Sequence, residues 1–185
     1  MFPQMMIDAD ICIKLGGSEK HLFLVEVIPL LAEETYMHKN ALGEVMMPPS
    51  AVRQLSQLVE DGTIRIVDET ILSSQDRLIY DMTYKKLERV MIDPRFKNKN
   101  LGEVCSLAFA KAKSIPVFAT DEMDLQHIVD RQLNSGMDDI KCLRIIDIIH
   151  MAKSEEINVK RKVAKALWVI SGKEKDKFDQ SVWPL

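Results

Sequence analysis

Short apolar runs alternate with longer amphipathic stretches along most of this chain of 185 residues. The apolar runs are short enough to be buried strands, and we expect strands at 5–7, 63–67, 115–119 and 140–145. The stretches between them carry apolar residues at helical spacing, which predicts helices at 19–36, 50–60, 75–92, 102–113, 124–134 and 155–170. Strands that alternate with helices favour a parallel sheet covered by helices on both faces.

The same pattern predicts details of these helices. Pro29 should break or kink the first helix, and Ser50 is a candidate N-cap for the second. The helix at 102–113 is apolar nearly all round and should be largely buried. In the helix at 75–92, the residues expected to face the core are Leu78, Ile79, Met82, Leu87 and Val90.

Composition excludes several classes of protein. With 46% hydrophobic and 29% charged residues, the chain has the composition of an ordinary globular protein. No apolar run reaches the roughly 18 residues that a membrane span needs, and an acid lies where a signal peptide needs a basic flank. The three cysteines, Cys12, Cys105 and Cys142, are odd in number and far apart, so we expect reduced core residues of a cytoplasmic protein.

The charge is unevenly distributed along the chain. The net charge of −3 argues against wholesale coating of nucleic acid, yet residues 151–185 hold eight lysines and arginines against five acids. We therefore expect a domain at 1–150 and a basic, helical extension at 151–185 packed on it. Trp168 and Trp183 would pack this extension onto the domain, or form a surface for a homodimer if they are exposed.

Acidic side chains gather where two strands are predicted to end. Asp8 and Asp10 follow the first strand, and Asp121, Glu122 and Asp124 follow the strand at 115–119. The carboxyl ends of parallel strands meet at one edge of the sheet, which is where ligands bind in such folds. The sequence therefore predicts a cluster of carboxylates at this edge.

Two further acids, Glu44 and Glu103, stand at the mouths of helices, each directly after a glycine that lets the backbone approach closely. Carboxylates from four segments would repel one another at one edge unless a cation neutralised them. Oxygen-only ligands select a hard cation such as Mg²⁺ or Mn²⁺. Such an ion lowers the pKa of a bound water and orients a phosphodiester, so no Ser or Cys nucleophile would be needed.

Each acid also has an ordinary structural explanation. Glu103 would be favoured in a first helical turn by the helix dipole, and Asp8 could end its strand by bonding the next turn. Asp124 is a natural N-cap for the helix after it, and Glu44 could simply be solvated. The metal-site interpretation therefore rests on the combination of the acids.

The combination resembles the PIN-like domain family of metal-dependent nucleases. The opening strand ends in Ile7-Asp8-Ala9-Asp10, and Ala41-Leu-Gly-Glu44 supplies the second acid of the family pattern. The third acid opens a small, apolar helix as Gly102-Glu103, and the fourth follows a strand as Thr120-Asp121. The resemblance covers about residues 5–150. It implies a three-layer α/β/α sandwich with a parallel sheet of four or five strands.

The resemblance also implies Mg²⁺- or Mn²⁺-dependent cleavage of RNA, and sometimes of DNA. Carried over by position, the catalytic acids are Asp8, Glu44, Glu103 and Asp121. Asp124 is a further candidate metal ligand, and Asp10 and Glu122 are secondary acids that depart from the usual family residues. Small family members are often toxins paired with an antitoxin; the sequence itself shows no such partner.

Basic residues precede Glu103 and would flank the metal edge, where they suit a phosphate backbone. The candidate nucleic-acid contacts are Lys85, Lys86, Arg89, Arg95, Lys97 and Lys99. The aromatic rings that could stack on the bases of a single strand are Tyr80, Tyr84 and Phe96. A solvated helix face and an ordinary lysine-rich loop would produce the same pattern.

Two other functions compete with a metal-dependent ribonuclease. The departures at Asp10 and Glu122 fit a catalytically silent PIN-like module that binds RNA or protein. Asp8-Ala-Asp10 also matches the opening motif of haloacid-dehalogenase-like phosphatases, with Asp8 as nucleophile, although the later motifs of that family do not fit.

Overall fold

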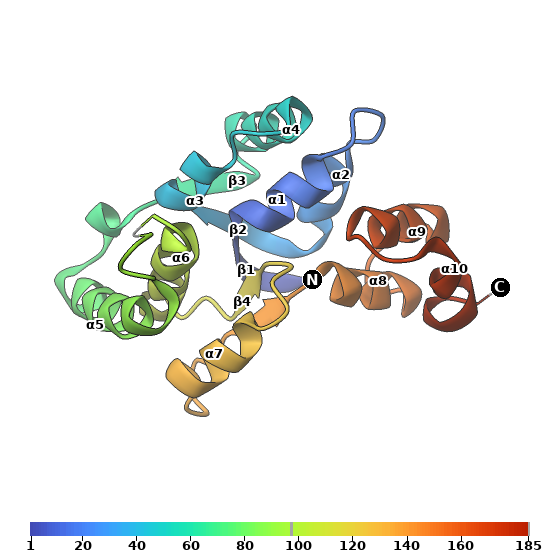
Figure 1. The fold of residues 1–185 in the computed structure, drawn as a ribbon. Helices are drawn as coiled ribbons and strands as arrows, with labels where there is room; N and C mark the ends of the chain where they lie inside the picture. The colour runs from blue at the N-terminus through green and yellow to red at the C-terminus, as the bar shows by residue number, and fades with distance from the viewer. Residues whose placement is uncertain (97, 185) are drawn as a thin grey trace.

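A five-stranded, all-parallel sheet forms the centre of the molecule (Figure 1). The computed structural model describes residues 1–96 and 98–184. The strands, in the sheet order β3-β2-β1-β4-β5, are β3 Ile64–Val67, β2 Ala32–His38, β1 Phe2–Ile7, β4 Val117–Ala119 and β5 Lys141–Leu143. Every neighbouring pair is parallel, so the carboxyl ends of all five strands lie at one edge.

Helices cover both faces of the sheet, which confirms the predicted three-layer sandwich. On one face, Met5 and Ile7 of β1 belong to the same core as helices α1 Ala9–Gly16, α2 Phe23–Val27, α4 Pro49–Glu60, α8 Ile145–Lys153 and α9 Arg161–Ile170. On the other face, Met6 and Phe118 pack with helices α5 Ser74–Met91, α6 Leu101–Ala112 and α7 Leu125–Gln132. Helix α3 Lys39–Glu44 follows β2 directly and contacts α6.

The single helix predicted at 19–36 is wrong. This stretch forms the short helix α2, a 3-10 turn at Ile28–Leu30 that contains Pro29, and then strand β2. Glu33 and Glu34 suit the exposed face of a helix as well as a strand, so the local pattern did not distinguish the two. Pairing with β1 on one side and β3 on the other decides in favour of the strand.

Two other predicted helix features need correction. Pro48, rather than Ser50, is the residue that precedes α4, and Ser50 is buried inside the first turn. The helix predicted at 155–170 begins only at Arg161. Helix α8 lies before it and shares only Ile145 with the predicted strand; no element was predicted for the rest of it. Four isoleucines at 145–149 follow β5 after Arg144 alone, which hid the start of α8.

Helix α5 lies where it was predicted, but it turns a different face to the core. Its buried residues are Tyr80, Thr83, Leu87 and Met91. The predicted inward residues Leu78, Ile79, Met82 and Val90 are exposed, and of the expected set only Leu87 is buried. Burial of Tyr80 also removes its ring as a candidate for stacking on bases.

The C-terminal residues pack on the domain. Leu167, Trp168 and Phe178 are buried in the same core as β1, and the predicted boundary at residue 150 lies within α8. The chain ends in the short helix α10 Lys175–Lys177 and a π-helical turn at Phe178–Val182, where the ring of Trp183 lies 6.3 Å from that of Phe178. Within residues 1–96 and 98–184, no helix has both the length and the apolar character to cross a membrane.

Candidate functional site

The carboxyl edge of the sheet brings residues from β1 and β4 together. Ile7 pairs with Ala119, so the residues that follow them, Asp8 and Thr120, leave the sheet at the same level. The Asp8 amide donates to the Ala119 carbonyl at 3.0 Å, and this bond fixes the height of Asp8 relative to β4. Parallel pairing of the two strands is thus what places both acidic segments at one edge.

Asp8 is the most deeply buried acid at this edge. Its exposed fraction is 2%, and its Oδ1 has no hydrogen-bond partner in the described residues. Asp8 precedes α1, yet among the described residues its side chain caps no amide of that helix. Burial raises the pKa of Asp8 well above its usual value, and the charges of Asp10 and Glu103 raise it further.

Glu103 lies in the first turn of α6, where the chain turns sharply. Asn100, with φ of 63°, directly precedes the helix, and its Nδ2 donates to the Met91 carbonyl at 2.9 Å, which holds the turn against the end of α5. Burial, followed by the charges of Glu122, Asp10 and Glu44, raises the pKa of Glu103 to about 7. The positive charge of Lys99 opposes this rise.

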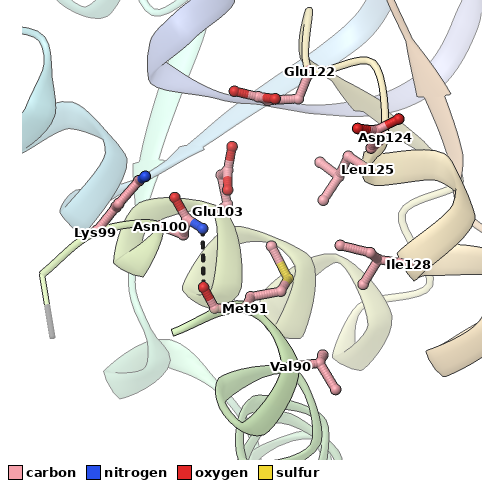
Figure 2. Close-up of a pocket in the computed structure, with 9 residues that line it drawn as sticks. All are labelled: Val90, Met91, Lys99, Asn100, Glu103, Glu122, Asp124, Leu125 and Ile128. Atoms are coloured by element: carbon pink, nitrogen blue, oxygen red, sulfur yellow. Dashed lines mark hydrogen bonds between the residues drawn. The ribbon is translucent and has the colours of Figure 1, made fainter. Parts of the chain in front are cut away.

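A hollow of about 260 Å³ opens beside Glu103 (Figure 2). Glu122, Asp124 and Lys99 share its wall with Glu103, whereas Met91, Leu125 and Ile128 give it an apolar side. In Figure 2 the Glu103 carboxylate points towards Glu122, with Lys99 on one side and Asp124 on the other. Asp124 is the N-cap residue of α7, as predicted, but among the described residues its side chain makes no capping hydrogen bond to that helix.

Glu44 makes a hydrogen bond that was not predicted from the sequence. Its Oε1 accepts a hydrogen bond from the Gly102 amide at 2.9 Å, and so satisfies a free amide in the first turn of α6. A Cβ at residue 102 would lie 2.7 Å from this oxygen, so the contact requires glycine there. Glu44 therefore holds the start of the helix that carries Glu103, and is more than a solvated residue.

Asp10 and Asp121 are joined by a hydrogen bond, and their remaining carboxylate oxygens contact other groups. Asp10 Oδ2 accepts from the Asp121 amide at 2.9 Å, and its Oδ1 from the Thr120 hydroxyl at 3.4 Å. Asp121 Oδ1 accepts from the Ile145 amide at 3.2 Å, and its Oδ2 pairs with Lys14 Nζ at 3.0 Å. Lys14 was missed at the sequence level, although its position one helical turn after Asp10 was a usable signal.

The acids share an edge but do not form a preassembled ligand set. In the part of the chain that the structure describes, no group of three or more His, Cys, Asp or Glu side chains is arranged to hold a metal ion. The charge of Glu103 raises the pKa of Asp8, whereas Asp121 is bonded to Lys14 and Glu44 to Gly102.

Of the predicted basic contacts, Lys99 lies at the acidic edge. Lys86 donates to the carbonyl of Gln132 at the end of α7, and Arg95 makes a paired contact with Asp93. Lys85 is exposed on α5. Lys97 lies outside the described residues.

Two more hollows adjoin the first around the segment that joins α5 to α6. One, of about 570 Å³, shares Lys99 with the hollow beside Glu103 and includes Arg95 and Phe96. The other, of about 520 Å³, is lined by Tyr84 and Arg89 and shares Pro94 and Asn98 with the second. Basic and aromatic side chains thus follow a concave surface that leads from Glu103 to α5.

No protein-family model, curated protein or solved structure matches this chain, so its function has to be inferred from the side chains at this edge.

Proposed function

We propose that this chain is a Mg²⁺- or Mn²⁺-dependent ribonuclease of the PIN-like kind that its motifs resemble. The observation that carries the proposal is Asp8 Oδ1, a buried carboxylate oxygen with no partner in the described residues. A carboxylate in such surroundings either takes up a proton or needs a cation. The neighbouring charges of Asp10 and Glu103 favour a cation with more than one positive charge.

We expect Asp8 and Glu103 to hold the ion; Glu122 and Asp124 line the hollow beside Glu103. These side chains would have to rotate slightly so that their carboxylate oxygens contact one ion together. A bound divalent ion would supply an activated water and stabilise the leaving oxygen of a phosphodiester. Because Glu103 has a pKa of about 7, it must give up its proton to become a ligand, so ion binding should strengthen as the pH rises.

The remaining predicted acids position the others. Glu44 fixes the first turn of α6 through Gly102, and Asp10 ties the end of β4 to α1 through the Asp121 amide. The first bond holds the start of α6, which carries Glu103, and the second ties the start of α1, which follows Asp8, to the segment after β4. We therefore assign Glu44, Asp10 and Asp121 to positioning the site in this conformation.

The adjoining hollows support RNA as the substrate. Lys99, Arg95 and Arg89 can each hold a phosphate, and the exposed ring of Phe96 and the half-buried ring of Tyr84 can stack on bases. Stacking on side chains needs unpaired bases, so the surface favours a single strand over a duplex.

The direct test is cleavage of single-stranded RNA by the purified protein in Mn²⁺, with Asp8→Asn beside the wild type. We expect the substitution to lower the rate on the order of 100-fold or more, because it removes the ligand oxygen. Asp61→Asn is the matched control, because Asp61 is an exposed acid just before β3, at the opposite edge of the sheet. Equal cleavage by Asp8→Asn and the wild type contradicts the proposal.

The silent PIN-like module stays the second candidate, and one observation favours it. The described acids are not preassembled for a metal ion, and Asp121 is neutralised by Lys14. Titration with Mn²⁺ separates the two functions: a nuclease should bind the ion in the millimolar range or tighter and melt at a higher temperature with it, whereas a silent module should not. Hydrolysis of a generic phosphomonoester, without RNA cleavage, would instead favour the phosphatase alternative.

A further inference from the structure

Lys14 reaches into the acidic edge from α1. Its Nζ lies 3.0 Å from Asp121 Oδ2 and 3.7 Å from Asp10 Oδ2, so one ammonium group lies between two carboxylates. Partial burial lowers the pKa of Lys14, but its hydrogen bond to Asp121 and the charges of Asp121 and Asp10 outweigh this and raise it. The side chain is therefore a permanent positive charge at this position.

The acids at the edge consequently divide into two pairs. In the outer pair, Asp10 and Asp121, every carboxylate oxygen has a partner: two backbone amides, the Thr120 hydroxyl and Lys14. The inner pair, Asp8 and Glu103, has no comparable neutralisation in the described residues. Asp8 Oδ1 is unpartnered, and the charge of Lys99 only partly offsets the burial of Glu103.

We propose that Lys14 is a tethered cation that occupies the place of a second divalent ion, so that the site takes a single ion at Asp8 and Glu103. This inference rests on the proposed nuclease function and specifies its metal stoichiometry. Phosphodiester-cleaving sites with two ions hold them about 4 Å apart between shared carboxylates. An ammonium group hydrogen-bonded to Asp121 both uses the oxygen that a second ion would need and repels that ion.

A purely structural role for Lys14 is the alternative. A bridge between α1 and the segment after β4 would help to hold the fold, and its loss would lower the melting temperature without changing how many ions bind. The number of bound ions therefore distinguishes the two roles where stability alone does not.

The test is the number of Mn²⁺ ions bound per chain, counted by electron paramagnetic resonance of the free ion during titration. We expect one ion for the wild type and for Lys14→Arg, which keeps the charge. Two ions are expected for Lys14→Met and Lys14→Gln, which lose it; the second variant serves if the first folds poorly. Lys113→Met is the matched control, because Lys113 pairs with Asp76 at 3.2 Å elsewhere on the surface, and it should bind one ion.

Each result has a definite meaning. A count of one in both neutral variants overturns the inference but leaves the proposed nuclease intact, as does a count of two in the wild type. If neither the wild type nor the neutral variants bind Mn²⁺, the proposed function itself is wrong, and the inference fails with it.

Discussion

At the scale of single residues, Asp8 and Glu103 show the same conflict between burial and charge. Each carboxyl group has a raised pKa, since burial penalises its ionised form and neighbouring acids add to the penalty. Without a cation, the folded protein therefore holds a proton on Glu103 over part of the neutral pH range. A divalent ion has to displace this proton in order to bind, so protonation and ion binding compete at Glu103.

Glu103→Gln should change how stability depends on pH. In the folded wild type the pKa of Glu103 is about 7, above the usual 4.5, so the folded state binds its proton more tightly than the unfolded state. Stability that is present below about pH 4.5 is therefore lost as the pH rises through 7. In EDTA, the variant should match the wild type near pH 4 and exceed its free energy of unfolding by about 2 to 3 kcal/mol at pH 8.

Urea unfolding at several pH values measures this difference, with Glu60→Gln at the exposed end of α4 as the control. The control should follow the wild type at every pH. A constant offset between Glu103→Gln and the wild type, independent of pH, would show that the carboxyl group titrates normally.

At the scale of elements, α5 shows why the position of a helix can be predicted from sequence even when its buried face cannot. Two apolar stripes run along it, one through Leu78 and Met82 and one through Tyr80 and Leu87. Both have helical spacing, so the pattern alone cannot choose between them. Contact with α6 selects the stripe that contains Leu87.

The assignment of this face predicts unequal effects of two alanine substitutions. Leu87→Ala should lower the free energy of unfolding by about 2 to 5 kcal/mol, because it leaves a cavity in the core. Met82→Ala should change it by less than about 0.5 kcal/mol, because Met82 is 66% exposed. Chemical denaturation of both variants checks this, and the reverse order would mean that α5 buries its other stripe.

The junction of α3 and α6 gives a second prediction at this scale. Gly102→Ala should destabilise the protein by about 1 to 3 kcal/mol, because its Cβ would displace the Glu44 carboxylate and leave the Gly102 amide unpaired. Gly43→Ala, in α3, is the control, since no atom of the described residues lies within 4 Å of a Cβ built there. Thermal unfolding compares the two; equal melting temperatures would argue against the Glu44 contact.

At the scale of the whole molecule, the sheet could be predicted and the details of the edge could not. The run at 115–119 is apolar because both faces of the sheet are covered at β4, whose three residues are all buried, and this is visible in sequence. Strand β2 was missed because Glu33 and Glu34 suit two kinds of element. The pairing of Lys14 with Asp121 joins residues 107 positions apart, and only the folded chain brings them together.

The packing of the C-terminal extension also could not be predicted from the sequence. Trp168 and Trp183 were expected to pack on the domain or to be exposed. Trp168 is buried and Trp183 is half-buried, and each ring lies 6.3 Å from that of Phe178. Arg161 and Lys165 of α9 both pair with Asp179 of the following turn. Two of the eight basic residues at 151–185 are thereby paired within the tail itself.

The most direct test of a metal site built on Asp8 is to locate the ion. Crystals grown or soaked in Mn²⁺ should show an anomalous peak within about 2.1 Å of Asp8 Oδ1 and of a Glu103 carboxylate oxygen. An ordered Asp8 carboxylate without an ion at saturating Mn²⁺, or a peak bound only by other residues, would contradict it.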